Sequence, residues 1–147
     1  MIRRFERRDI ERVMKIWLSS NMEVHSFIPA DYWLKNYEPV KLMIADAEVY
    51  VFEYHKTVIG FAGITEGYLA GLFVDATFRS KGVGKALLDC LKTFYPRITL
   101  HVYERNSGAV HFYEREGFST VSADTDDETG EREYMMVWRK EAEKSNE

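Results

Sequence analysis

The chain has 147 residues, of which 46% are hydrophobic, and this suits one ordinary domain with one buried core. Its formal net charge of -4 excludes general nucleic-acid binding, because a phosphate backbone is bound by a basic face. A single cysteine excludes an internal disulfide and is consistent with a reducing compartment.

The N-terminal segment MIRRFERRDIERV spreads charge along its length and lacks an apolar stretch of signal-peptide length. No later segment approaches a membrane span. We therefore expect a cytoplasmic protein with no nucleic-acid and no membrane partner. One domain is expected over residues 1–140 and a frayed tail over residues 141–147, and the oligomeric state stays open between monomer and homodimer.

The first part of the chain predicts a strand and two helices. Residues 2–5 have the pattern of a short strand, and Asp9 opens a helix. A second helix is expected around residues 32–45, bent or divided near Pro39 because proline lacks a backbone N–H. The apolar residues of the first helix fall at helical spacing: Ile10, Val13, Met14, Trp17 and Leu18.

Three strands are predicted in the middle of the chain. Residues 49–54 and 58–64 are β-rich runs on either side of His55 and Lys56, which is the layout of a hairpin. Residues 68–74 are nearly all apolar, as expected for a strand that is covered on both faces.

The following segment predicts a helix, a strand and a last helix. Pro96 ends the first of these helices, and residues 98–103 alternate as a strand does. Asn106 suits the N-cap of a helix that runs to Gly117. The first helix presents one apolar face, which places Cys90 against the core and consists of Val83, Leu87, Cys90, Leu91 and Phe94.

Two strands close the fold, over residues 118–124 and 131–139. They are joined by the acidic turn DDETGE, which we interpret as a solvated hairpin tip rather than a cation site. One cysteine and four dispersed histidines give no metal-ligand spacing, so we expect no metal site.

The stretch RSKGVGKALLD, residues 79–89, follows an apolar run and opens a helix. Free backbone N–H groups and the helix dipole favour an anion at such a place. Two familiar phosphate motifs fail. A P-loop needs glycine where Arg79 stands and Ser or Thr where Ala86 stands, and a dinucleotide fingerprint needs a small residue where Leu87 stands. The spacing alone also fits a purely structural tight turn.

A second constellation is NSGAVHFYEREGF, residues 106–118. Together with LFVDATFRSKGVGKALLD it resembles the two hallmark motifs of the GNAT superfamily, the Gcn5-related N-acetyltransferases. The first hallmark is an Arg or Gln, two residues, Gly, one residue, then Gly or Ala, matched by Arg79, Ser80, Lys81, Gly82, Val83 and Gly84. The second is Asn, two residues, Ala, two residues, an aromatic, Tyr, then Gly and Phe, matched by Asn106, Ala109, Phe112, Tyr113, Gly117 and Phe118.

The resemblance implies a mixed α/β (α+β) domain with a central, mostly antiparallel, splayed sheet of about seven strands and helices on both faces. It also implies acetyl-CoA as co-substrate. In the family, turn amides at the start of the central helix hold the pyrophosphate, and the pantetheine arm lies beside the preceding strand. The implied binding residues are Leu72, Phe73, Val74, the turn from Arg79 through Ser80, Lys81, Gly82, Val83 and Gly84 to Lys85, and Asn106, Phe112 and Tyr113.

The implied reaction is acyl transfer from a thioester to an amine by direct attack, which needs a base for the amine and an acid for the leaving thiolate. Family precedent gives the acid role to Tyr113, and a phenol with a pKa near 10 is a competent donor. In ribosomal-protein N-terminal acetyltransferases, the base is a glutamate five residues before the motif asparagine. His101 stands at that position here, and histidine is a competent base. Glu104, Glu66 and water are the alternatives.

The segment EVHSFIPADYW, residues 23–33, corresponds to one wall of the acceptor site in the family. Its residues His25, Phe27, Tyr32 and Trp33 either line that site or serve as core and loop residues. The segments HSFIPADYW and NSGAVHFY also resemble small bacterial members that acetylate protein lysines. A peptide or protein amine, either a lysine or an N-terminus, is therefore the first expected acceptor.

Two alternatives remain open at this stage. The acceptor is a small amine, such as a polyamine, an amino acid or an antibiotic, or the chain is a non-catalytic module that binds or senses acyl-CoA. A placed acid at Tyr113 and a base at His101 distinguish an enzyme from such a module.

Overall fold

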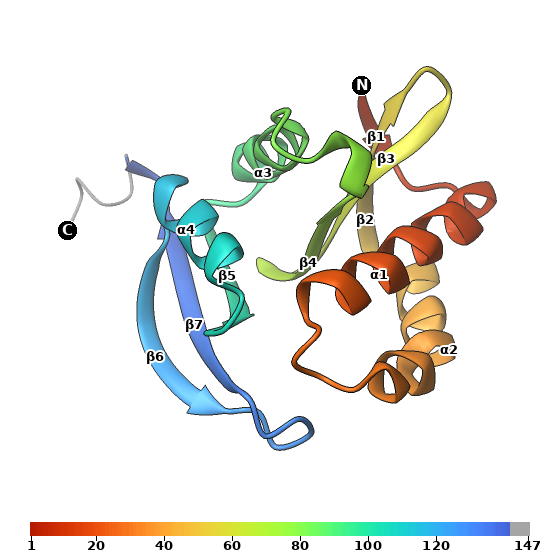
Figure 1. The fold of residues 1–147 in the computed structure, drawn as a ribbon. Coiled ribbons are helices and arrows are strands. Elements are labelled where there is room, and N and C mark those ends of the chain that lie inside the picture. Colours follow the sequence, from red (N-terminus) through yellow and green to blue (C-terminus); the bar gives the residue numbers. More distant parts are fainter. Residues whose placement is uncertain (142–147) are drawn as a thin grey trace.

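The computed structural model describes residues 1–141 and contains one seven-stranded sheet in the order β1-β2-β3-β4-β5-β7-β6 (Figure 1). Neighbouring strands are antiparallel except β4 and β5, which are parallel. The mostly antiparallel sheet that the resemblance implies is thus confirmed. The strands are β1 (Ile2–Arg4), β2 (Glu48–Tyr54), β3 (Thr57–Thr65), β4 (Tyr68–Val74), β5 (Arg97–Tyr103), β6 (Ser119–Thr125) and β7 (Arg132–Arg139).

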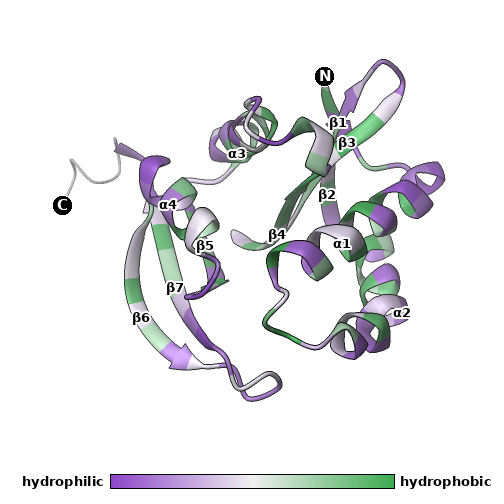
Figure 2. Cartoon of the chain, in the orientation of Figure 1, coloured by the Kyte–Doolittle hydropathy of each residue, from purple (hydrophilic) through white to green (hydrophobic). Residues whose placement is uncertain are grey.

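Helices cover both faces of the sheet, because alternate side chains of a strand point to opposite faces. In β2, Val49 and Val51 pack with α1 and α2, whereas Tyr50 packs on the side of α3 and α4. Figure 2 shows hydrophobic colours along β3 and β4, which lie between these layers. The helices are α1 (Ile10–Val24), α2 (Ala30–Asp46), α3 (Val83–Phe94) and α4 (Ser107–Arg115), with short 3-10 turns at Arg7–Asp9 and Ala76–Phe78.

β4 and β5 are joined only at one end. Tyr68 pairs with Thr99 and Leu69 pairs with Leu100, and beyond these pairs the two strands separate (Figure 1). The sheet is therefore divided into a β1–β4 half and a β5–β7 half, which is the splay that the resemblance implies. The C-terminal part of β4 has a strand partner on one edge only, namely β3.

The predicted covering of residues 68–74 on both faces is wrong. Only Leu69 is buried, Tyr68 and Ala70 are exposed, and the residues from Gly71 to Val74 are half-buried. The splay is the physical reason, because this part of β4 borders an opening in the sheet instead of a neighbouring strand. Its apolar side chains remain available to a ligand.

In α3 the buried face differs from the predicted one. Cys90 is only half-buried, and Phe94 is 59% exposed and stacks on the ring of Tyr50 at 5.8 Å between centroids. The buried stripe includes Leu88, so Cys90 lies on its flank, and Phe94 is the last residue of the helix, where no further turn encloses it. The buried residues are Val83, Leu87, Leu88 and Leu91.

Pro39 lies inside α2, which runs unbroken from Ala30 to Asp46, so the helix is not divided there. A proline removes one backbone N–H, and the rest of the hydrogen-bond ladder persists. The other predicted strands and helices are confirmed to within two residues at their ends. Of the predicted tail, residues 142–147 lie outside the described residues. Within residues 1–141, no helix has the length and apolar character needed to cross a membrane.

Candidate active site in the open sheet

A cleft of about 950 Å³ occupies the opening between β4 and β5. Its walls come from α1, the C-terminal part of β4, the first turn of α3, β5 and α4. The structure brings together every predicted site residue except Lys81. The predicted residues that line the cleft are Leu72, Phe73, Val74, Arg79, Ser80, Gly82, Val83, Gly84, Lys85, His101, Asn106, Phe112 and Tyr113.

The turn before α3 presents backbone N–H groups at one end of the cleft. Gly82 is the N-cap of α3 with φ +84°, and no side chain caps the helix there. Ser80 has φ +63°, a conformation that non-glycine residues adopt rarely and that is found preferentially at ligand sites. An uncapped helix N-terminus with the positive end of its dipole suits a phosphate group.

The two glycines of this turn serve different purposes. A β-carbon on Gly82 would meet nothing within 4 Å, so Gly82 is needed for its backbone angle. A β-carbon on Gly84 would lie 3.6 Å from Cζ of Phe112 and 3.8 Å from Cγ2 of Val74. Gly84 therefore keeps this end of the cleft open between β4 and α4.

Two of the three basic side chains around the turn are paired with acidic residues. Lys81 does not line the cleft, and Lys85 pairs with Asp89 and with Glu116, both at 3.2 Å. Arg79 pairs with Glu23 of α1, and its Nε donates a hydrogen bond to the carbonyl of Val74 at 3.3 Å. The uncapped backbone N–H groups at the start of α3 are therefore the groups at this end that are open to an anion.

Tyr113 lies in the α4 wall of the cleft. Its ring contacts Phe112 and Phe118, with centroids 5.2 Å and 5.4 Å away. Among residues 1–141, its hydroxyl has no hydrogen-bond partner, although Tyr113 is only 8% exposed. Burial raises the pKa of Tyr113 above its ordinary value, so the phenol stays protonated at neutral pH and can donate a proton.

His101 lies on β5, on the face opposite to Leu100 and Val102. Its Nδ1 is 2.9 Å from the hydroxyl of Tyr68. Glu133 of β7 lines the same cleft; burial raises its pKa, and the nearby His101 opposes that rise. A histidine beside a carboxylate that is partly removed from water is suited to accept a proton from a cationic amine.

The two rival bases lie elsewhere. Glu66 occupies the turn between β3 and β4 with φ +50°, and Glu104 forms an ion pair with Arg132 at 3.0 Å. Neither of them lines the cleft.

His25 and Trp33 line the cleft at the end far from α3, whereas Phe27 and Tyr32 do not. The rings of His25 and Trp33 stack at 5.6 Å between centroids with an interplanar angle of 26°. His25 Nε2 is 3.0 Å from the side-chain nitrogen of Asn106, and the Asn106 oxygen accepts a hydrogen bond from the backbone N–H of Ala109. Both polar atoms of the Asn106 side chain are thus engaged within the protein.

The acidic turn between β6 and β7 makes direct contacts with the helical side of the cleft. Tyr103 donates a hydrogen bond to Asp126 at 3.1 Å, and Tyr32 donates one to Glu128 at 2.8 Å. Burial and the bond to Glu128 raise the pKa of Tyr32 to about 12. The predicted solvated tip is therefore also tethered to α2, and it brings the carboxylate of Asp126 to Tyr103, which lines the cleft.

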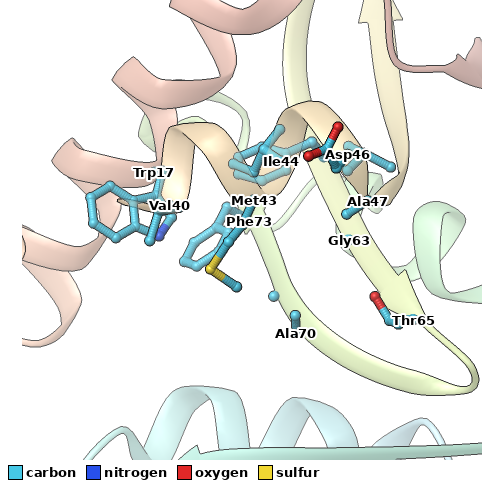
Figure 3. Close-up of a pocket in the computed structure, with 13 residues that line it drawn as sticks. Trp17, Val40, Met43, Ile44, Asp46, Ala47, Gly63, Thr65, Ala70 and Phe73 are labelled. Atoms are coloured by element: carbon cyan, nitrogen blue, oxygen red, sulfur yellow. The ribbon is translucent and has the colours of Figure 1, made fainter. Parts of the chain in front are cut away.

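A second, apolar depression of about 460 Å³ adjoins the cleft beneath α2 (Figure 3). It shares Trp17, Ala70, Gly71 and Phe73 with the cleft. Val40, Met43 and Ile44 of α2 form its other wall, and Asp46 is the charged residue at its rim. The cleft is thus extended on the α2 side by apolar surface.

Sequence reasoning missed Asn21, Tyr68, Tyr103 and Glu133, all of which line the cleft. Glu133 lies opposite Tyr103 in the pairing of β7 with β5, and only that register shows it as a site residue. Among residues 1–141, no group of three or more His, Cys, Asp or Glu side chains is arranged to hold a metal ion.

Comparison with known proteins gives consistent relationships. Residues 45–120 match the family model described as "Acetyltransferase (GNAT) domain". The chain is 34% identical over 140 residues to "Peptidyl-lysine N-acetyltransferase YiaC" of Escherichia coli, covering 94% of this chain and 96% of that protein. It is 30% identical over 130 residues to "Peptidyl-lysine N-acetyltransferase YjaB" of Salmonella typhimurium, covering 88% of this chain and 90% of that protein.

Among solved structures, apo YjaB of Escherichia coli superimposes with a TM-score of 0.84 at 26% identity, covering 94% of this chain and 96% of that chain. A streptothricin acetyltransferase from Bacillus anthracis, described as putative and solved in complex with acetyl coenzyme A, gives a TM-score of 0.59 at 25% identity. That match covers 63% of this chain and 62% of the other.

Proposed function

Because the chain belongs to the GNAT acetyltransferase family and is therefore an acetyltransferase, we propose that it moves the acetyl group of acetyl-CoA to the lysine side chain of a protein or peptide. The choice of acceptor is supported by relatives that are named for peptidyl-lysine and align over nearly the whole chain. Acetyl-CoA as donor is supported by the family and by a structural neighbour that binds it.

One observation carries the proposal: the cleft runs from an uncapped helix N-terminus to an unpartnered, protonated tyrosine. The backbone around Gly82 is suited to the pyrophosphate of acetyl-CoA. The free edge of β4 beside Leu72, Phe73 and Val74 offers hydrogen-bonding groups and apolar surface to the pantetheine arm. Phe112 and Tyr113 form the opposite wall.

The chemistry follows from two groups that line the cleft, His101 and Tyr113. His101 accepts a proton from the acceptor amine, which makes its nitrogen lone pair available for attack on the thioester carbonyl carbon. A C–N bond forms and the C–S bond breaks. Tyr113 donates its proton to the departing sulfur, and the acylated nitrogen gives up its second proton, which returns to the Tyr113 phenolate. The products are therefore a neutral amide and a neutral thiol, and His101 then releases its proton to solvent.

Acidic groups favour a cationic acceptor at the far end of the cleft. Glu133 lines the cleft, and Asp126 and Glu128 are held in the adjoining turn by Tyr103 and Tyr32. The negative charge of these carboxylates attracts a protonated lysine side chain before His101 takes its proton.

The proposed acid is tested by Tyr113→Phe. We expect kcat for acetylation of lysine peptides to fall at least about 100-fold, the usual scale for a general acid, with acetyl-CoA affinity unchanged. Thiol release measures turnover and calorimetry measures affinity. Tyr54→Phe, which makes the same chemical change at an exposed hairpin residue, should leave both unchanged. Unchanged turnover of Tyr113→Phe on every active amine would show that the acid assignment is wrong.

The proposed base is tested by the pH dependence of kcat/KM. His101→Gln should remove the acidic limb of the profile and lower the rate about 100-fold near neutral pH. Glu104→Gln, outside the cleft, is the matched control and should keep the wild-type profile. An acidic limb that survives in His101→Gln would assign the base to another group.

We propose the cytoplasm as the compartment of this reaction. The only cysteine, Cys90, is free and half-buried, so the fold needs no oxidising environment.

A further inference from the structure

A line of four hydrogen bonds crosses the cleft at the end far from α3. The backbone N–H of Ala109 donates to the oxygen of Asn106 at 3.3 Å, and Asn106 Nδ2 is 3.0 Å from His25 Nε2. His25 Nδ1 is 2.8 Å from the oxygen of Asn21, and Asn21 Nδ2 donates to the carbonyl of Trp17 at 2.9 Å. The line starts on α4 and ends inside α1.

The two backbone ends of this line fix the direction of every bond. Because Asn106 accepts from a backbone N–H, its amino group must donate to Nε2 of His25. Because Asn21 donates to a backbone carbonyl, its oxygen must accept from Nδ1–H of His25. His25 is therefore neutral with its proton on Nδ1, and neither ring nitrogen is free to act as a base.

The surroundings of His25 agree with this state. Burial lowers its pKa to about 4. Its ring contacts Phe27, Trp33 and Tyr103, so the loop after α1, the start of α2 and the end of β5 meet at this point. Of the titratable and charged groups on these elements, Tyr103 touches the ring, and Arg105 lies over Phe27 at 4.7 Å from its centroid.

The position of this line matters because the two halves of the sheet share only two residue pairs, Tyr68 with Thr99 and Leu69 with Leu100. Those pairs hold the closed end of the splay. His25 belongs to the β1–β4 half through α1, and Asn106 belongs to the β5–β7 half through α4. The bond between them is a further link between the halves across the cleft, beside the hydrogen bond of Tyr32 with Glu128 and the contact of the His25 ring with Tyr103.

We propose that His25 is a positioning residue: together with Asn21 and Asn106 it forms a strut that fixes the width of the cleft, and so the distance between β4 and Tyr113 on α4. This role rests on the proposed acetyl transfer, since Tyr113 must reach a sulfur held along β4. A displacement of about 1 Å at such a site lowers rates as much as 100-fold.

The test is Asn106→Asp. An aspartate keeps the N-cap for Ala109 but presents an oxygen, not an amino group, to His25. At pH 8 the strut is broken, and we expect kcat at saturating acetyl-CoA to fall about tenfold. A neighbouring carboxylate should raise the pKa of His25 to about 7. Protonated His25 then donates to the new carboxylate, so kcat relative to that of the wild type at the same pH should recover as the pH falls to about 6.

Asn106→Ser is the matched control, because serine also caps a helix but offers no charge for His25. It should lose activity as Asn106→Asp does at pH 8 and should not recover at pH 6. Equal activity of both variants and the wild type at pH 8, or identical pH profiles of the two variants, would overturn the proposal.

A second readout separates this proposal from the proposed function. The His25 ring resonances, followed by NMR against pH, should titrate near pH 4 in the wild type and near neutral pH in Asn106→Asp. This holds whichever amine the enzyme acetylates. An unshifted titration would refute the strut, whereas a shifted titration in a protein that acetylates no amine would leave the strut standing and refute the proposed reaction.

Discussion

Two helices begin at the cleft, and they begin in opposite ways. At the start of α3, Gly82 provides no side-chain cap and the backbone N–H groups are left open. At the start of α4, Asn106 caps Ala109 and is itself held by His25. Both asparagine and glycine are motif residues, yet only the glycine end is free to bind a ligand. Capping thus distinguishes a helix N-terminus whose N–H groups are open to a ligand from one whose N–H groups are engaged within the protein.

The largest effect that tests this comparison is expected at the uncapped start of α3, on the affinity for acetyl-CoA. Gly82→Val places a β-branched residue at φ +84°, so the turn must move although no atom blocks the new side chain. We expect acetyl-CoA affinity to fall at least about 100-fold, since charge-assisted hydrogen bonds contribute about 1.5–3 kcal/mol each. Calorimetric titration with acetyl-CoA measures it.

Gly108→Ala is the control for that substitution. Its β-carbon also meets nothing within 4 Å, but it lies in α4 and needs no positive φ. Affinity should be kept there. Wild-type affinity in Gly82→Val, with the fold intact by circular dichroism, would refute a backbone cradle at α3.

An intermediate effect is expected at the capped start of α4, where the stability of the fold should fall with the pH. The pKa of His25 in the fold, about 4, lies below the ordinary 6.5, so the fold favours the neutral ring. This stabilisation is complete above about pH 6.5 and is lost as the pH falls through about 4. Because His25 is half-buried, solvent screening reduces the loss to about 2 kcal/mol.

Urea unfolding between pH 7 and pH 4 gives the free energy of unfolding of the wild type and of His25→Phe. The free energy of unfolding of His25→Phe should depend less on pH, and the difference between the two proteins measures this loss. Phenylalanine keeps the ring contact with Trp33 and removes the titrating group. Parallel pH profiles for the two proteins would contradict a neutral His25 in the fold.

The smallest effect is expected from the lysines at the open end. Lys81 lies outside the cleft, and Lys85 is already paired with Asp89 and Glu116. Either substitution to alanine should weaken acetyl-CoA binding by less than about threefold, because exposed charges interact weakly through water. Titration at low and high salt measures the effect. A loss of acetyl-CoA affinity as large as that of Gly82→Val would show that the lysine side chains, and not the backbone N–H groups, bind the anion.

Much of the fold follows from local sequence signals. The His55–Lys56 turn, the helix start at Gly82, the Asn106 cap and the stop at Gly117 are each set by residues a few positions apart. Turns and helix ends of this kind can be predicted from a single sequence, because the residues that determine them are neighbours in the chain. The cleft residues within the two motifs were predicted by the resemblance to the GNAT superfamily, because spacing alone also fits a structural tight turn.

The rest depends on contacts between distant residues. Glu133 reaches the cleft only through the register of β7 with β5, and His25 meets Asn106 across 81 positions of sequence. A single sequence carries no local signal for either pairing. The apolar run of β4 misled the prediction for a related reason, since a strand that borders a cleft has the same composition as one that is covered on both faces.

The short pairing of β4 with β5, over two residue pairs, also affects the local unfolding of the molecule. Amide protons of β4 beyond Leu69 that face β5 have no strand acceptor there, so they should exchange with solvent early. The β5–β7 half then forms a unit whose separation from the rest breaks few backbone bonds. A donor molecule bound along β4 would slow the amide exchange of β4 and the separation of the β5–β7 half. Local unfolding of this protein is therefore expected to become less frequent as the concentration of its own substrate rises.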